Sequence, residues 1–302
     1  MNMTLNLKNI NKTISSLFPR LQQNHFLESS IDYSYNDVYT PINNYSSDRF
    51  IEFRLPKSHG VFTDMSALYL KFNLNVKKLS TDGSEWGSKE RTAEGDHYDL
   101  SQAIAYSLFS HLSIELNGLQ ICNENNYALL SYIRLITQFP MDEIDKIGRL
   151  MHLEIYDKII PTHESDGYFT GLSPTNAIAI RLKNIRDYGI SVYAPLITDV
   201  CQINSYLLDD IEMGIKLSIH DDSTIFITHQ YNSDVEDDAN GKKYVSELSN
   251  VSLHVKKIKP TENSYNALQK TITPNNNQVP YINYVYTSKL SRQFHLPAGQ
   301  NG

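Results

Sequence analysis

The histidines are the side chains of this chain best suited to bind a metal ion, but their spacing matches no familiar ligand pattern. The ten histidines stand singly, and the sequence contains neither His-Glu-x-x-His nor His-x-His. A zinc-protease helix needs two histidines one turn apart, and a cupin site needs closely spaced histidines on strands. We therefore predict no metal site, and we interpret His111 and His254 as partly buried, hydrogen-bonded side chains of strands.

Nucleophilic and phosphate chemistry also lack their sequence patterns. There is no Gly-x-Ser-x-Gly elbow and no Gly-x-x-x-x-Gly-Lys loop. Cys122 and Cys201, the two cysteines, have no histidine close enough in sequence to form a motif. Two cysteines are also too few for a disulfide framework. This low number favours synthesis in a reducing, intracellular compartment.

Two pairs of carboxylates, Asp209-Asp210 and Asp221-Asp222, bracket a predicted strand at 211–219. A glycosidase uses two carboxyl groups as acid and base, but acidic residues at strand ends more commonly form turns. We interpret these pairs as turn residues. The sequence thus predicts no catalytic residue, no cofactor and no enzymatic activity.

Charge gives no strong reason to expect nucleic-acid binding. The chain of 302 residues has a formal net charge of −7, and its lysine clusters at 77–78, 242–243 and 256–259 are short and not interleaved with aromatic residues. We interpret these clusters as solvated strand ends. The first residues lack the apolar core of a signal peptide, and no apolar run of about 18 residues occurs, so we expect neither secretion nor a membrane span.

The elements that would position these side chains are mostly strands. Apolar and polar residues alternate with period two through much of 51–118, as they do in a strand with one buried face. Similar patterns predict strands at 34–40, 49–55, 67–76, 112–116, 119–122, 177–182, 189–196, 211–219, 224–228, 251–258, 279–287 and 289–296. This is an all-β sandwich of jelly-roll or Greek-key type with helical insertions.

Composition divides the chain into four predicted parts. They are an N-terminal arm at 1–30, a first jelly roll at 31–229, an acidic loop or linker at 230–243, and C-terminal strands at 244–302 with a short helix at 262–270. Within the first jelly roll we predict a long exposed loop at 80–97 and a helical insertion at 127–150. The arm has apolar residues at helical spacing, which would dock either on a neighbouring molecule or on its own domain.

Several sequence blocks together resemble the major capsid protein of Polinton (Maverick) and adintovirus-like elements. They include Ile51-Glu52-Phe53, Leu68-Tyr69-Leu70-Lys71-Phe72, Ser107-Leu108-Phe109-Ser110, Leu112-Ser113-Ile114-Glu115-Leu116-Asn117-Gly118, and Phe294-His295-Leu296-Pro297. The resemblance implies a double jelly-roll capsid subunit without catalytic residues. It also implies homotrimers that tile an icosahedral shell, contact with other capsid proteins such as a penton, and a place in the virion.

The chain departs from this family in its length. Two jelly rolls need about sixteen strands of about 5–6 residues each, and we identify about a dozen. We therefore expect a shortened, truncated or split version, with the start of a second jelly roll at 244–302. The alternative function is a jelly-roll binding module for a glycan or protein ligand, which would gather exposed aromatic residues, drawn from the 20 tyrosines, on one sheet face.

Overall fold

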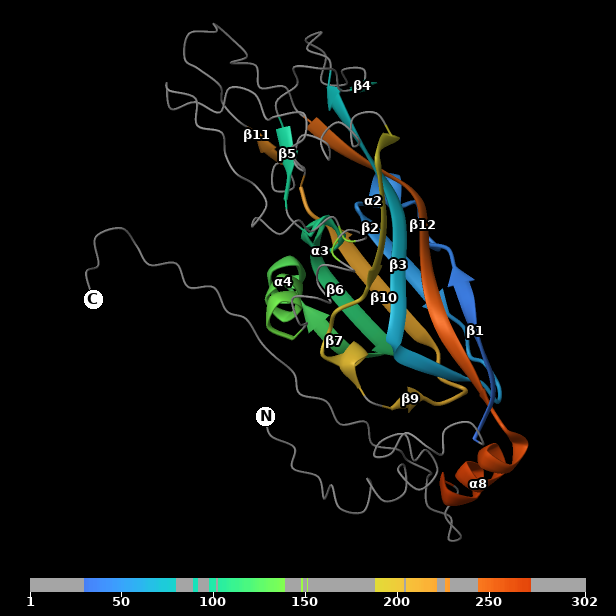
Figure 1. Cartoon of the computed structure of the whole chain (residues 1–302). Helices are drawn as coiled ribbons and strands as arrows, with labels where there is room; N and C mark the ends of the chain where they lie inside the picture. The colour runs from blue at the N-terminus through green and yellow to red at the C-terminus, as the bar shows by residue number, and fades with distance from the viewer. Residues whose placement is uncertain are drawn as a thin grey trace, which may run out of the picture.

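A computed structural model describes residues 30–79, 89–91, 98–101, 103–138, 148, 151, 188–203, 205–221, 226–228 and 244–272. Two antiparallel sheets pack face to face in this part of the chain (Figure 1). The first sheet has the order β2 (Phe50–Leu55), β10 (Met213–Ile219), β6 (Phe109–Leu116) and β7 (Leu119–Glu124).

The second sheet has β1 (Ile31–Tyr39), β12 (Tyr244–Pro260), β3 (Phe62–Leu79) and β8 (Ile190–Pro195) as neighbours. The short strands β4 (Lys89–Arg91) and β9 (Tyr206–Leu207) pair with the two ends of β3. A separate pair joins β5 (Tyr98–Leu100) to β11 (Phe226–Thr228).

The pairing of the eight main strands is that of a rolled-up hairpin. The first main strand pairs with the last (β1 with β12), the second with the seventh (β2 with β10), the third with the sixth (β3 with β8), and the fourth with the fifth (β6 with β7). This order defines a jelly roll, in which two Greek keys close one sandwich. The predicted jelly-roll fold is confirmed, and one roll is complete within 31–260.

The core lies between the two sheets and follows from the period-two pattern. Alternate residues of each strand point inward and are almost fully buried, as in Phe53, Phe72, Leu112, Val192, Ile215 and Leu253. Phe72 of β3 and Phe109 of β6 meet edge to face across the sandwich, with ring centroids 6.0 Å apart. The alternation therefore sets both the strand conformation and the face that each strand buries.

Strand β12 corrects the predicted domain boundary. The prediction placed 244–302 outside the first jelly roll, but β12 lies between β1 and β3 in the middle of the sheet. Residues 244–260 therefore belong to the first sandwich and do not begin a second one. Sequence patterns could not decide this, because an alternating strand carries no information about which sheet it joins.

Other predictions are tested in part. The helical insertion predicted at 127–150 is confirmed over its first part as α4 (Tyr127–Gln138), and the helix predicted at 262–270 as α8 (Glu262–Ile272). The loop at 80–97 is not unbroken, because Lys89–Arg91 forms β4 and pairs with β3. The predicted arm at 1–30 (apart from Ser30), nearly all of 139–150, the strand at 177–182, the acidic segment 230–243 and the strands after 272 lie outside the described residues.

The described helices are short and lie at the margins of the sandwich. Besides α4 and α8 they are α2 (Tyr45–Asp48), α3 (Ile104–Ser107) and the 3-10 turn η3 (Val200–Gln202). Figure 1 shows α4 on one flank, beside α3 and β7, and α8 at the far end of β12. None of the described helices is long and apolar enough to cross a membrane.

Candidate functional site

Asp209 and Asp210 do not meet Asp221 in space, and Asp222 lies outside the described residues. Asp209 and Asp210 precede β10, whereas Asp221 follows it and lies 3.8 Å from Arg49. A strand of seven residues spans about 23 Å, far more than the 5–9.5 Å that separates the two carboxyls of a glycosidase. These carboxylates therefore cannot act as a glycosidase pair.

The two strand histidines have hydrogen-bonding or aromatic neighbours. The Nε2 atom of His111 lies 2.6 Å from Oδ1 of Asn123 on the neighbouring β7. The ring of His254 meets Tyr193 edge-on, and Tyr193 stacks on Tyr69 with ring planes 4° apart and centroids at 5.1 Å. Three aromatic rings thus gather on the outer face of the β12–β3–β8 sheet.

One predicted solvated lysine is buried. Lys257 of β12 is 3% exposed, and its ammonium donates to Oγ1 of Thr63 at 2.8 Å. Burial lowers the pKa of this amine, and the charge of Asp37 opposes the shift. The interpretation of 256–259 as a solvated strand end is wrong at this position, because the inward face of β12 continues through Lys257.

Both cysteines are buried thiols without a disulfide bond. Burial raises the pKa of Cys201 to about 11, and burial together with the Glu124 carboxylate raises that of Cys122 further. Thiolates are the nucleophilic form, so these groups are poor nucleophiles at neutral pH.

A hollow on the outer face of the β2–β10–β6 sheet has a volume of about 210 Å³. Its walls carry charged groups that already pair with each other, such as Arg54 with Glu52 at 3.0 Å. Ligand pockets are usually about 300–1,000 Å³ and mostly apolar. The hollow is therefore a poor candidate for a small-molecule site.

Helix α4 carries the most distinctive exposed feature, an apolar stripe that faces solvent. Leu129, Tyr132, Ile133 and Ile136 are 46%, 38%, 43% and 50% exposed. Their spacing of i, i+3, i+4 and i+7 places them on one face of the helix. Tyr127, Leu130 and Leu135 occupy the buried face, so α4 is apolar on two sides. A helix of this kind is normally buried on both sides.

A buried arginine fixes α4 to the sandwich. Arg134 is 1% exposed, and its two terminal nitrogens donate to both carboxylate oxygens of Glu124 on β7 at 2.7 and 2.9 Å. The same guanidinium pairs with Asp199 at 3.0 Å and donates to the Ile197 carbonyl at 3.3 Å. One cation thus joins the helix, β7 and the segment that follows β8.

The charges around Arg134 favour its protonated form. Burial lowers the pKa of the guanidinium, but hydrogen bonds and charge from Glu124 and Asp199 outweigh that effect and raise it overall. A fixed bidentate pair of this geometry holds α4 in one orientation. The exposed stripe is therefore presented on a rigid support.

Strand β1 offers a second surface. Tyr33 and Tyr35, 53% and 39% exposed, lie on one face of β1 with ring centroids 6.0 Å apart, and Val38, 57% exposed, lies on the other face. In the part of the chain that the structure describes, β1 pairs on one side only, with β12. The free edge of a strand presents unpaired N–H and C=O groups to a partner.

The apolar residues of α4 occupy two faces of the helix rather than one. Leu129, Ile133 and Ile136 lie on the exposed face, whereas Leu130 and Leu135 are buried. A helical-wheel count could have separated these two groups. No sequence signal pointed to Arg134, because Asp199 lies 65 positions away in the chain.

No protein-family model matches the chain. No curated protein matches it either.

Solved structures of viral proteins are similar to it. A chain in the cryo-EM structure of the Sputnik virophage shares 11% identity over 81% of this chain and 52% of its own length, with a TM-score of 0.48. The Faustovirus major capsid protein shares 12% identity over 89% of this chain and 65% of its own length, also with a TM-score of 0.48. The mavirus major capsid protein shares 11% identity over 74% of this chain and 46% of its own length, with a TM-score of 0.37.

The chain thus spans between about half and two thirds of the length of these structures. At such low identity the jelly-roll assignment rests on the strand pairing itself. The described residues form one complete jelly roll that presents an exposed apolar helix and a free strand edge.

Proposed function

We propose that this chain is a structural subunit of a viral capsid, which associates with copies of itself to build an icosahedral shell. The jelly roll occurs in viral capsid proteins, lectins and cupins. The sequence resemblance to Polinton and adintovirus-like capsid proteins favours the first class. Three of its blocks lie in β2, β3 and β6, the strands that build both halves of the core.

The observation that carries the proposal is the exposed apolar stripe of α4. Contiguous apolar surface of this kind on a soluble protein usually marks an interaction site. The occupant we propose is a second copy of the chain, since a shell built from one subunit must bury part of every subunit against its neighbours. The β1 edge would add polar, tyrosine-rich contacts.

The finer assignment is a homotrimer in the virion of a Polinton-like element, made in the host cell and joined by other capsid proteins such as a penton. It follows the sequence resemblance. One chain with two jelly rolls gives a trimer a roughly six-fold outline, whereas a chain with one roll does not. By the same resemblance, we propose that the jelly roll at 31–260 is one of two rolls that each subunit supplies to such a trimer.

The test is the mass of the full chain in solution, measured by light scattering over a range of concentrations. We expect a species near three protomers of 34.6 kDa each, or a larger assembly. The variant Ile133→Asp should shift this species to the monomer because a charge on the stripe cannot be buried without a partner. Its melting temperature should stay close to that of the native chain, since Ile133 is 43% exposed in the monomer.

Ile42→Asp is the matched control, because Ile42 is 59% exposed and lies between β1 and β2 rather than on α4. It should leave the assembly intact. A native chain that stays monomeric at all concentrations would contradict self-association. Equal dissociation by both variants would contradict the role of α4.

A glycan-binding module is the second candidate, favoured by the aromatic cluster of Tyr69, Tyr193 and His254. Tyr69 and Tyr193 stack on each other, so one face of each ring is already covered, whereas sugars stack on open ring faces. The cluster is thus less suited to sugar than to packing. Binding of a monomeric chain to a glycan array, lost in Tyr193→Ala, would favour this candidate over the capsid subunit.

A further inference from the structure

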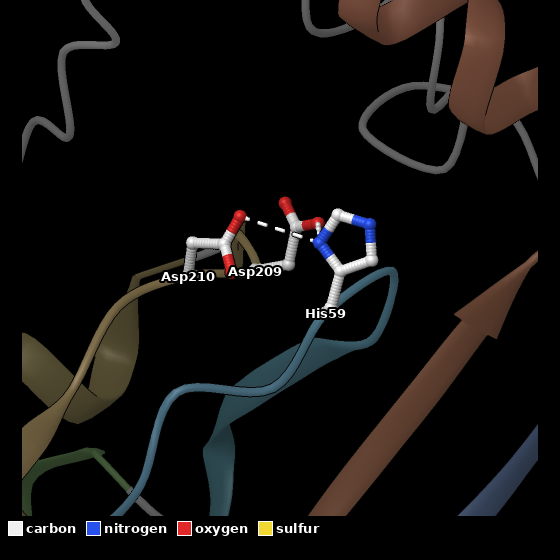
Figure 2. A group of neighbouring side chains, drawn as sticks. All are labelled: His59, Asp209 and Asp210. Carbon is white, nitrogen blue, oxygen red and sulfur yellow. Dashed lines mark ion pairs between the residues drawn. The ribbon is translucent and has the colours of Figure 1, made fainter.

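A histidine and two aspartates from distant parts of the sequence meet at the end of the sandwich near α8. His59 lies in the turn between β2 and β3, and Asp209 and Asp210 lie in the turn between β9 and β10. Figure 2 shows the imidazole facing the two carboxylates. The Nδ1 atom of His59 is 3.4 Å from Oδ2 of Asp210 and 3.9 Å from Oδ2 of Asp209.

The Asp209 carboxylate is held firmly in this position. Its side chain is 6% exposed, and Oδ2 accepts hydrogen bonds from the Gly60 amide at 2.9 Å and from the Tyr265 hydroxyl of α8 at 2.6 Å. The Asp210 amide donates to the Ser58 carbonyl at 3.0 Å, which ties the two turns together. His59 and Asp210, in contrast, are 82% and 64% exposed and can adjust to a ligand.

The separations within the cluster suit ligands of a shared cation better than a direct hydrogen bond. A hydrogen bond joins heavy atoms at about 2.7–3.2 Å, and both His59 distances exceed that range. Ligands placed about 2.0–2.1 Å from a tetrahedral Zn²⁺ lie about 3.4 Å from one another. One ligand atom from each of the three side chains lies within 4.8 Å of the other two, a spread that small rotations of His59 and Asp210 would close.

The donor set and its surroundings select the class of metal. Imidazole nitrogen together with carboxylate oxygen suits Zn²⁺ and related transition metals, whereas Ca²⁺ and Mg²⁺ prefer oxygen ligands alone. The Lys259 ammonium lies beside the turn, 3.0 Å from the position that a Cβ on Gly60 would take. Its charge opposes any divalent cation at the cluster, so the coordinate bonds from imidazole and carboxylate, which are stronger to Zn²⁺ than to the hard cations, must outweigh that repulsion.

We propose that His59, Asp209 and Asp210 bind one divalent transition-metal ion of the Zn²⁺ class, with water completing its coordination. The ion joins the β2–β3 turn to the β9–β10 turn. Through the Asp209–Tyr265 hydrogen bond it also holds α8 against the end of the sandwich. The site does not depend on the capsid role, because all three ligands come from one chain.

The test is calorimetric titration of the metal-free full chain with ZnCl₂ and, separately, with CaCl₂. The variants are His59→Ala and Asp210→Asn, both at exposed positions; asparagine also tolerates the positive φ of 59° at residue 210. Asp209 is left unchanged because it also holds Gly60 and Tyr265. His111→Gln is the control, since that ring contacts the Asn123 amide rather than a carboxylate.

We expect the native chain and His111→Gln to bind one Zn²⁺ at this site and to melt at a higher temperature with Zn²⁺ present. Each ligand variant should bind Zn²⁺ about tenfold more weakly or worse, and Ca²⁺ should not bind measurably. The proposal is overturned if the native chain binds no Zn²⁺. It is also overturned if His59→Ala and Asp210→Asn bind Zn²⁺ as tightly as the native chain.

Discussion

A single side chain, Arg134, fixes the helix that carries the exposed apolar stripe. Its guanidinium pairs with two buried carboxylates, Glu124 and Asp199, from separate segments. Replacing a buried ion pair entirely can be neutral, but removing one partner leaves the other charge buried without compensation. Loss of Arg134 should therefore be destabilising mainly because it would leave the Glu124 and Asp199 carboxylates buried without a cation.

We predict that Arg134→Met lowers the free energy of unfolding by about 3–5 kcal/mol, measured by urea denaturation. Arg54→Met is the matched control, because Arg54 pairs with Glu52 and Glu212 on the exposed outer face. The control should cost less than about 1 kcal/mol, as exposed ion pairs do. Equal losses in the two variants would contradict the role assigned to the buried charges.

Cys201 should make stability depend on pH in the alkaline range. An unfolded thiol titrates near pH 8.5, whereas burial raises the pKa of the folded Cys201 to about 11. The folded state therefore keeps its proton longer than the unfolded state. The resulting stabilisation is complete below about pH 8.5 and is lost as the pH rises toward 11.

We expect the free energy of unfolding of the native chain to fall more steeply between pH 8 and 10.5 than that of Cys201→Ala. The alanine variant is less stable overall because it leaves a cavity, so the comparison concerns the two slopes rather than the absolute values. Identical slopes would show that the thiol is not protected in the folded state.

At the scale of the elements, the entry into β8 depends on a glycine. Gly189 has a φ of +74°, and a Cβ there would meet the Asn75 side chain and lie 2.9 Å from the Leu74 carbonyl oxygen. Gly118, in the turn between β6 and β7, has a similar φ of +78° but open space around it. A side chain at either position would strain the backbone, but only at Gly189 would it also clash with neighbouring atoms.

We predict that Gly118→Ala costs about 1 kcal/mol through backbone strain alone, and that Gly189→Ala costs about 2 kcal/mol or more. The larger loss arises because Ile190, the next residue, pairs with Leu74, so the clash cannot relax without shifting the β3–β8 ladder. Urea denaturation of both variants measures the difference. A Gly189→Ala loss no greater than that of Gly118→Ala would contradict the close approach.

For the molecule as a whole, β12 decides whether the sandwich closes. It is 17 residues long, pairs with β1 on one side and β3 on the other, and arrives after the predicted acidic segment 230–243. Covalent continuity through that segment matters less than the presence of β12, because the strand is held by two ladders.

We therefore predict opposite outcomes for a chain cleaved within 230–243 and a chain truncated at residue 229. A chain with a protease site engineered into 230–243 should, once cleaved, keep its two fragments together in gel filtration and unfold cooperatively. A chain that ends at residue 229 should fail to fold, because β1 loses its only pairing partner among the described strands. A folded 1–229 fragment would support the original boundary at 230 instead.

Part of this structure was predictable because it is local. The period-two alternation at 51–55, 67–76 and 112–116 predicted β2, part of β3 and part of β6, since a strand with one buried face must alternate. The helical insertion predicted at 127–150 likewise contains α4, which ends before Pro140. Strand ends were less accurate, because β3 and β12 extend well beyond their most regular patterns.

The sequence by itself determined the all-β class, the places of the main strands and the resemblance to capsid proteins, because these depend on neighbouring residues. Only the tertiary structure decided that β12 closes the first roll, that α4 exposes an apolar face, and that Arg134 and Lys257 are buried. It also brought His59 to Asp209 and Asp210, 150 positions away. Those outcomes depend on which strands pair, and the pairing of segments far apart in the chain produces no repeating pattern of residues in the sequence.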